Sequence, residues 1–576
     1  MAYIWSYMKK YPLALAGSFL GSILFVIVNL GLPTILARII NESLINQDYS
    51  GLWRNVTWML VLVVIGLVGN MLNVYAGSRI TTSVVRDIRN DMYQKIQYYS
   101  HEEYRAIGVP SLITRMTTDA FVVMQYTEVL LRSGLTPIIM IAGSVTLIFL
   151  NAPALSWLLF SAVPFIILIF YVIITRSRPL SQQLQVVLDK INLFARENLT
   201  GLRVIRAFAR EDYQVKKFGR ANDEYANLAL RLNKLMGSAQ PLFAHVLMWV
   251  TVITVWSALG PLEQGNIQVG TVLAFTEYLF HALFSIMIFS QIFMMSPRAL
   301  TSSRRLEDVM TMPISINPNP DGIKYTSTQG HVEFRNVSFA YPDELEFEPI
   351  KNISFKASPG ETVAFIGSTG SGKSTIIQLV PRLFDVTEGA VLVDGVDVRD
   401  YNVKALRDKI GYVPQKINLF EGTIRENLQF ADADISESEM DHAIDVAQAS
   451  EFISSLDKGY DSFLAEGGSN FSGGQKQRLS IARAVAKDPS IYIFDDSFSA
   501  LDYQTDAELR RRLAAITKNA TVLLVAQRVS SIVNADQIIV LDQGRIAGQG
   551  THEELLATNK IYQEIAQSQT KDEEDN

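Results

Sequence analysis

Six apolar segments in the first half of the chain limit its possible folds more than any other feature. Each is close to or above the length of about 20 residues that a helix needs to cross the hydrocarbon core of a bilayer. The sequence therefore predicts six membrane-spanning helices. They are approximately Pro12 to Ile39, Val56 to Ala76, Leu135 to Leu150, Ala154 to Thr175, Pro241 to Leu259 and Val269 to Met295.

Two long joints, after the second and fourth segments, are helical in pattern and rich in Arg and Lys. An excess of basic residues marks the cytoplasmic side of a membrane protein, and Lys9 and Lys10 ahead of the first segment agree with this orientation. We therefore expect both joints and the N-terminus in the cytoplasm, with the spanning helices continuing beyond the bilayer. The first segment is too long for a signal-peptide core, so it is expected to be retained.

Glu277 and His281 stand four residues apart in the sixth segment, on one face of a helix. Ionisable side chains at membrane depth are costly unless they are paired or face water. The pair is therefore a candidate site for a cationic substrate or a proton. The alternative is that the two side chains only satisfy one another.

A second domain is predicted after a turn-rich stretch that begins at Pro313, because hydrophobic periodicity changes from helical to strand-like at about Val332. The pair Asp394–Gly395 is typical of a hairpin turn. The predicted organisation is a membrane domain over 1–312, a linker over 313–330, a nucleotide-binding domain over 331–570 and an acidic tail over 571–576.

Residues Gly367 to Thr375 read Gly-Ser-Thr-Gly-Ser-Gly-Lys-Ser-Thr, between a strand-like run and a helical run. This is the full G-x-x-x-x-G-K-[ST] pattern of a P-loop, whose backbone N–H groups surround phosphate at a helix N-terminus. Lys373 is expected to reach the β- and γ-phosphates and the Ser374 hydroxyl to bind Mg²⁺. A plain glycine-rich surface turn is the alternative, which the strand-turn-helix context disfavours.

Two further stretches suit the same chemistry. The apolar strand from Ile491 ends in Asp495 and Asp496, and Asp495 is the predicted Mg²⁺ ligand. Ser472 precedes a helical run and can cap it, with two glycines that leave N–H groups exposed for a second anion. Alone, that Ser-Gly-Gly run would be only a cap and turn.

Composition excludes several functions. The net charge is −7 and we find no basic tract, so nucleic-acid binding is not expected. The chain has no cysteine, which rules out disulfides, thiol catalysis and Cys-ligated zinc.

Taken together, these motifs resemble those of an ABC exporter half-transporter over nearly the whole chain. The resemblance implies an α-helical membrane domain with six transmembrane helices, followed by an α/β P-loop NTPase domain. It also implies ATP and Mg²⁺ as cofactors, the long joints as coupling loops, and a second subunit, because each ATP lies between one P-loop and the other subunit's signature motif.

The resemblance also assigns individual residues. The ATP-binding set is Tyr341, which would stack on adenine, with Gly367, Ser368, Thr369, Gly370, Ser371, Gly372, Lys373, Ser374 and Thr375. Mg²⁺ would be bound by Ser374, Gln415 and Asp495. The signature motif acting on the partner's ATP would be Phe471, Ser472, Gly473, Gly474 and Gln475, and Asp502 would be the D-loop aspartate.

Besides the mild change to Phe471, where the family usually has Leu, two departures from the family pattern bear on hydrolysis. Asp496 stands where the family has the glutamate that acts as general base, and Gln527 stands where it has the switch histidine. A carboxylate displaced by one methylene could cost about 10²-fold in rate, because positioning is most of the catalysis. An amide can bind a γ-phosphate but cannot carry an imidazolium charge. We therefore expect a weakly hydrolysing ATP site in one half of a heterodimer.

The expected function is ATP-driven export of hydrophobic or cationic small molecules, in a bacterial inner membrane, with the nucleotide-binding domain and both termini in the cytoplasm. A homodimeric exporter of lipid or peptide, or a nucleotide-gated channel or regulatory protein, remains an alternative.

Overall fold

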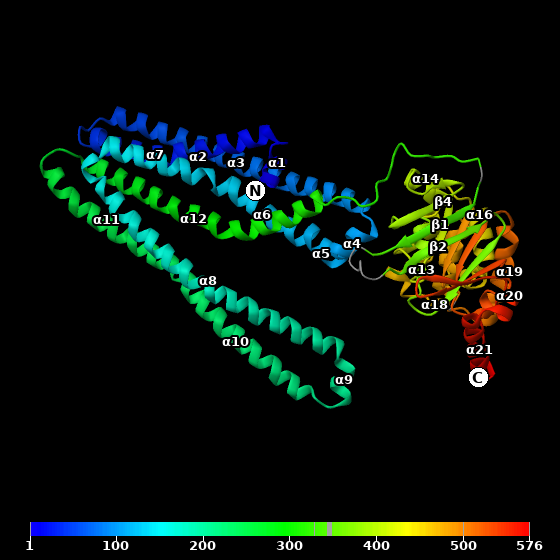
Figure 1. Cartoon of the computed structure of the whole chain (residues 1–576). Coiled ribbons are helices and arrows are strands. Elements are labelled where there is room, and N and C mark those ends of the chain that lie inside the picture. Colours follow the sequence, from blue (N-terminus) through cyan, green and yellow to red (C-terminus); the bar gives the residue numbers. More distant parts are fainter. Residues whose placement is uncertain (1, 328, 342–347, 499, 575–576) are drawn as a thin grey trace. The chain divides into compact units, whose positions relative to one another are not determined.

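The computed structural model describes residues 2–327, 329–341, 348–498 and 500–574. Residue 328 of the predicted linker and residues 575 and 576 of the predicted tail lie outside this range. The chain forms two compact units (Figure 1). The first comprises Met1–Gln94 and Pro110–Thr311, and the second comprises Lys95–Val109 and Met312–Asn576.

The first unit is helical, and six of its described stretches are long and apolar enough to cross a membrane, as predicted. The helices extend beyond the predicted spans, and α3 alone has 49 residues. Their bounds are α1 (Ala2–Met8), α2 (Pro12–Arg38), α3 (Tyr49–Gln97), α5 (Val109–Thr114), α6 (Ala120–Ser133), α7 (Leu135–Asn151), α8 (Trp157–Thr200), α9 (Leu202–Ala207), α10 (Glu211–Gly237), α11 (Ala239–Glu263) and α12 (Val269–Thr311). The π-helical turns η1 (Ile39–Leu44) and η2 (Arg115–Asp119) extend α2 and precede α6, and the 3₁₀ turn η3 (Pro153–Leu155) precedes α8.

Small residues let α2 and α3 pack closely. A Cβ added to Gly21 would lie 2.6 Å from the Gly69 carbonyl oxygen, so the backbones meet where only glycine fits. Beside this contact the Asn73 amide donates to Ser22 Oγ at 2.6 Å and to the Ser18 carbonyl at 2.9 Å. Polar groups buried between these helices are therefore satisfied within the helix pair.

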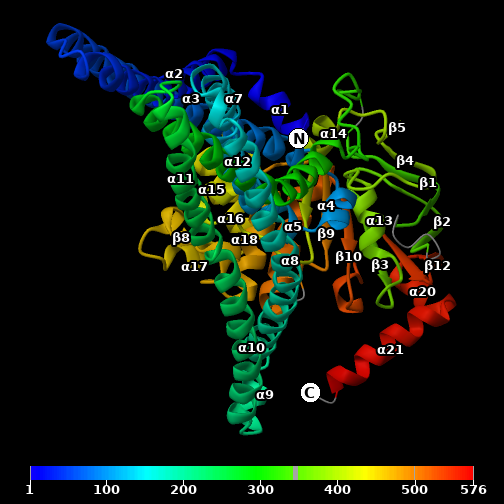
Figure 2. The same ribbon diagram turned by 90° about the vertical axis from the view of Figure 1, so that its left-hand side faces the viewer.

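The helices α8 and α10 lie side by side and form a long hairpin with α9 at its tip (Figures 1 and 2). Four large apolar side chains around the tip are exposed: Leu199, Leu202, Val204 and Phe208. Glu197, at the base of the tip, pairs with Lys217 of α10 at 3.3 Å.

The second unit contains two main sheets. The larger has the strand order β12-β11-β3-β10-β9-β6 and is parallel except for β12, and the smaller antiparallel sheet has the order β2-β1-β4-β5. The strands are β1 (Val332–Phe339), β2 (Ile350–Ala357), β3 (Thr362–Gly367), β4 (Glu388–Val393), β5 (Val396–Asp397), β6 (Ile410–Val413), β9 (Ile491–Asp495), β10 (Thr521–Val525), β11 (Gln537–Asp542) and β12 (Arg545–Gly550), with a separate pair β7 (Gly422–Thr423) and β8 (Phe463–Leu464).

The second unit also contains ten described α-helices. They are α4 (His101–Ile107), α13 (Lys373–Leu379), α14 (Val403–Asp408), α15 (Ile424–Gln429), α16 (Glu437–Val446), α17 (Ser450–Ser454), α18 (Gly473–Val485), α19 (Tyr503–Ile516), α20 (His552–Thr558) and α21 (Lys560–Glu574). Of these, α13, α14, α18 and α20 pack against strands of the two main sheets. Strands β3, β9 and β10 are buried almost throughout, which fits a parallel sheet covered on both faces. The predicted hairpin at Asp394–Gly395 is confirmed, since Val393 pairs with Val396 and both turn residues have positive φ.

Candidate functional site

The predicted strand-turn-helix around the glycine-rich loop is present. The loop leaves β3 at Gly367 and enters α13 at Lys373. Gly372 has φ of 97°, and an added Cβ would lie 2.3 Å from the Pro349 carbonyl oxygen, so only glycine fits there. Lys373 Nζ donates to the Gly367 and Ser368 carbonyls at 2.9 and 2.8 Å.

The loop also holds an unsatisfied polar group. The hydroxyl of Ser371 is buried and has no hydrogen-bond partner among the residues that the structure describes. A buried hydroxyl without a hydrogen-bond partner lowers the stability of the folded protein, and an oxygen-rich ligand in the loop would provide that partner. The loop therefore fits a phosphate group.

Ser374 and Asp495 meet beside the loop. Strand β9 ends at Asp495, which is 2% exposed, and Ser374 Oγ donates to its Oδ1 at 2.8 Å. Burial raises the pKa of the Asp495 carboxyl, the Ser374 hydrogen bond opposes this, and the neighbouring Asp496 charge adds to it. Burial lowers the pKa of the Lys373 ammonium, against the attraction of Asp496 and Asp495. A divalent cation would offset the cost of the buried carboxylate, so this donor set fits Mg²⁺.

One carboxylate oxygen of Asp496 accepts hydrogen bonds from two side-chain amides. Gln527 Nε2 donates to Asp496 Oδ2 at 2.6 Å and Gln415 Nε2 donates to the same atom at 3.2 Å. The backbone of Asp496 has φ of 48° and its N–H donates to the Val525 carbonyl at 3.0 Å. The structure thus brings together three residues that are far apart in the sequence.

Tyr341 lies beside the start of α13. Its hydroxyl is 3.0 Å from Thr375 Oγ1, and its ring packs edge-on against Phe339 and Phe384 at centroid distances of 4.9 and 5.4 Å. The Arg105 guanidinium of α4 lies 5.6 Å from the ring centroid of Tyr341. An aromatic ring near the P-loop is therefore held in place by neighbouring rings.

The predicted cap of α18 is confirmed. Ser472 Oγ accepts from Gln475 N at 3.3 Å and Gln475 Oε1 accepts from Ser472 N at 2.9 Å, which is a capping box. Phe471 packs edge-on against Phe452, and Gly474 lies close to the Ala500 carbonyl. Among the described residues no hydrogen bond joins this segment to the P-loop.

Asp502 lies outside both clusters. It is exposed and caps α19, with Oδ1 accepting from Thr505 N at 2.9 Å. The backbone hydrogen bond from Thr505 lowers the pKa of the Asp502 carboxyl.

Glu277 and His281 belong to the first unit, in α12. Glu277 is exposed and His281 is half-buried, and these two described side chains share no hydrogen bond or ion pair. The rings of Phe280 and Phe284 stack beside them with centroids 5.6 Å apart.

One contact near the site had no signal in the motifs. Gln569, in the last helix, hydrogen-bonds to the backbone on both sides of Arg528, directly after Gln527. In the sequence, Gln569 is visible only as a polar residue that continues an apolar helix face. No sequence motif of the chain predicts this contact.

The comparisons with known proteins agree with this geometry. The ABC transporter transmembrane region matches residues 15–287, and the ABC transporter nucleotide-binding family matches residues 350–499. An uncharacterized ABC transporter ATP-binding protein of Mycobacterium tuberculosis is 37% identical, over 99% of this chain and 98% of that protein. An ATP-dependent lipid A-core flippase of Vibrio parahaemolyticus is 28% identical, over 98% of this chain and 96% of that protein.

A solved structure supports the fold. A bacterial Atm1-family ABC exporter with ATP bound superposes with a TM-score of 0.80 and 24% identity, over 96% of this chain and 98% of that chain. Because the sequence relatives are matched almost end to end, the chain belongs to the ABC transporter family and is an ATP-driven exporter, with a helical membrane domain followed by an ABC nucleotide-binding domain.

Proposed function

We propose that this chain is one half of a heterodimeric exporter, and that its own P-loop forms the slower of two ATP sites. ATP would bind with its phosphates on residues 367–375 and its adenine on Tyr341. Ser374, Gln415 and Asp495 would hold Mg²⁺, which would supply positive charge to the phosphates. Closure of the two nucleotide domains on ATP would then be transmitted to the membrane helices.

The observation that carries the slow-site proposal is the position of the Asp496 carboxylate. Its Oδ2 accepts hydrogen bonds from Gln415 and Gln527, so both lone pairs of that oxygen are engaged by protein amides. A water proton can be accepted there only if one amide leaves. Asp496 also reaches one methylene less far than the family's glutamate, so it is a poorly placed general base.

The partner is proposed from two features. The signature segment around Ser472 keeps its helix cap and glycines, so it can complete an ATP site on another subunit. The hairpin tip around α9 exposes Leu202, Val204 and Phe208 together, and an apolar cluster of this kind favours a protein contact. We propose that the tip docks on the partner's nucleotide domain.

The proposed cargo is a hydrophobic or cationic small molecule. Glu277, Phe280, His281 and Phe284 fall on one stripe of α12, and an acid beside stacked rings suits a cation with apolar groups. Phe275 and Tyr278 instead lie buried in the helix packing. The lipid A-core flippase relative favours lipid as the second candidate cargo.

We also propose a location in a bacterial cell membrane. The basic residues of the long joints support a cytoplasmic side for those joints, the nucleotide domain and the termini.

The test is steady-state Mg-ATP hydrolysis by the full chain alone in lipid nanodiscs, with ATP binding measured on the same sample. We expect tight binding with turnover far below one per second, a typical enzyme rate being about 10 per second. The matched variant Asp496→Glu is expected to raise turnover by about 10²-fold or less, because it restores the reach of the base.

Turnover near one per second by the wild-type chain, with no gain in Asp496→Glu, would show that Asp496 is a competent base. The chain would then be a homodimeric exporter that needs no partner. A chain that does not bind ATP would remove the assignment of the P-loop itself.

A further inference from the structure

The last helix of the chain contacts the loop that carries Gln527. Gln569 Nε2 donates to the Gln527 carbonyl at 2.7 Å, and Gln569 Oε1 accepts from the Val529 N–H at 2.7 Å. One side-chain amide thus satisfies a donor and an acceptor on either side of Arg528. Such a two-point contact fixes the direction of the backbone as well as its position.

The helix α21 holds this amide in place by packing. Tyr562 is fully buried and Ile565 and Ala566 pack against the same core, on the stripe that Gln569 continues one turn later. Because the stem of Gln569 extends from a packed face, its side chain has fewer conformations to lose when it makes the two hydrogen bonds. Gln567, two residues earlier, is exposed.

The loop is anchored at its other end by the central sheet. The Ala526 N–H donates to the Phe365 carbonyl of β3 at 3.1 Å. Gln527 therefore lies between a contact to β3 and a contact to α21, and its own amide donates to Asp496 Oδ2 at 2.6 Å. Fixing the backbone at both sides fixes the origin of the Gln527 side chain.

We propose that Gln569 is a positioning residue for Gln527, so that the C-terminal helix sets how well this site recognises the γ-phosphate of ATP. The inference rests on the proposed function and on Gln527, at the family's switch position, hydrogen-bonding that phosphate through its amide. ATP and ADP differ at the γ-phosphate, so a displaced Gln527 weakens ATP binding and leaves ADP binding unchanged. The C-terminal helix thereby becomes a place where the affinity for ATP can be adjusted without touching the P-loop.

The experiment compares Gln569→Ala, Gln527→Ala and the double variant in the full chain in nanodiscs. The measured quantity is the ratio of the Kd for Mg-ADP to the Kd for Mg-ATP. We expect each single variant to lower this ratio by about three- to tenfold, the range of a modest hydrogen bond, with an unchanged Kd for ADP. The double variant is expected to be no worse than Gln527→Ala, because both act through one contact.

Gln567→Ala is the matched control, since it removes the same side chain from the exposed side of the same helix and is expected to keep the wild-type ratio. Amide hydrogen exchange in the peptide that contains Val529 should be faster in Gln569→Ala only. A wild-type ratio in Gln569→Ala beside a lowered ratio in Gln527→Ala would overturn the inference alone. A wild-type ratio in Gln527→Ala would overturn the proposed role of Gln527 and the inference with it. An equal loss of ATP and ADP affinity in Gln569→Ala would overturn the inference by showing that Gln569 has a merely structural role.

Discussion

The buried carboxylate of Asp495 costs the folded protein stability. Burial raises the pKa of this carboxyl above the ordinary value of 3.8. The Ser374 hydrogen bond and the Lys373 charge oppose this rise, and the repulsion of Asp496 adds to it. A carboxyl whose pKa is higher in the folded state binds protons more readily there than in the unfolded chain. The free energy of unfolding therefore falls as pH rises from 3.8 through the folded pKa, and the whole cost is present above that folded pKa.

We predict that Asp495→Asn raises the apparent Tm of the nucleotide-free chain at pH 7 by a few degrees. Asparagine has nearly the same shape and its Oδ1 can still accept from Ser374, but it carries no charge to bury. The gain should shrink as the pH is lowered toward 3.8, where the wild-type carboxyl becomes protonated. The measurement is thermal unfolding of the full chain in detergent over a pH series.

Mg-ATP provides the control for this variant. Wild type should gain Tm on addition of Mg-ATP, because a ligand that binds only the folded state stabilises it. Asp495→Asn should gain less, since it lacks the carboxylate that we assign to Mg²⁺. A lower Tm for the nucleotide-free variant would mean that the Ser374 hydrogen bond outweighs the buried charge.

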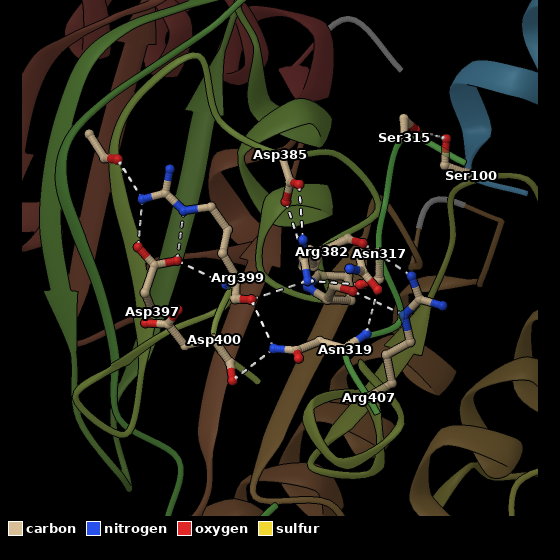
Figure 3. Close-up of polar contacts among 12 residues, drawn as sticks. Ser100, Ser315, Asn317, Asn319, Arg382, Asp385, Asp397, Arg399, Asp400 and Arg407 are labelled. Carbon is tan, nitrogen blue, oxygen red and sulfur yellow. Dashed lines mark hydrogen bonds and ion pairs between the residues drawn. The ribbon is translucent and has the colours of Figure 1, made fainter. Parts of the chain in front are cut away.

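At the scale of elements, single side chains form hydrogen bonds between the stretch after α12, around Asn317 and Asn319, and the rest of the nucleotide domain (Figure 3). Arg382, whose side chain is 6% exposed, makes a two-pronged contact with Asp385 at 2.7 and 3.0 Å and donates to the carbonyls of Asn317 and Arg399. Asn319 donates to the carbonyls of Arg399 and Asp400. The residues predicted as a linker are therefore hydrogen-bonded to the domain rather than free of it.

We predict that Arg382→Ala destabilises the chain by about 2 kcal/mol, because it removes the donor that Asp385 and the Asn317 carbonyl share. The Arg399 carbonyl keeps its hydrogen bond from Asn319. The expected readout is a lower apparent Tm and faster amide exchange around Asn317. This expected loss of stability is smaller than for a fully buried ion pair, since Asp385 is partly exposed and can bind water.

Arg399→Ala is the matched comparison. Arg399 pairs with Asp397 at 2.6 Å in the same region, but its side chain is 42% exposed, and such surface pairs contribute about 1 kcal/mol or less. A loss in Arg399→Ala as large as that in Arg382→Ala would contradict the importance given to burial here.

Elements whose pattern lies in consecutive residues were predicted well from the sequence. Strand β1 begins at Val332, where strand-like periodicity is predicted to start, the Asp394–Gly395 turn joins β4 to β5, and Ser472 caps α18. Each depends on periodicity or on turn and cap residues within a few positions. The apolar segments mark only part of each membrane helix, and the predicted continuation of the helices beyond these segments is confirmed by α3, which has 49 residues.

Contacts between distant residues were not predictable in this way. The pairing of Gln569 with the loop after β10, and of Gln415 with Asp496, depends on how the sheet brings separate segments together. The sequence roles proposed for the signature residues and for Asp502 stay predictions, since the ATP that they are proposed to contact would lie on a second subunit.

At the scale of the whole molecule, the grouping of α4 with the second unit is a further feature of tertiary structure alone. Glu103 of α4 accepts from the Ser315 N–H at 2.6 Å, Ser100 and Ser315 share a hydrogen bond (Figure 3), and His101 packs edge-on against Phe384. Each contact is one side chain, so no periodicity signals it. A segment inside the first long joint thereby belongs to the nucleotide domain.

The last prediction concerns two copies of this chain that pair with one another when the proposed partner subunit is not present. It uses the chain with Asp496→Glu and Gln527→His so that hydrolysis can be followed. In that background Lys373→Ala disables the P-loop and Ser472→Ala disables the signature, and each variant alone should be inactive. When the two variants are co-expressed, activity should return, because each mixed dimer keeps one intact P-loop opposite one intact signature. If the chains pair at random, about half of the dimers are mixed and about a quarter of all ATP sites are intact. Since Ser472→Ala also removes a helix cap of about 1 kcal/mol, its apparent Tm must be checked. No recovery in mixtures that are shown to contain folded mixed dimers would mean that one chain completes its own site.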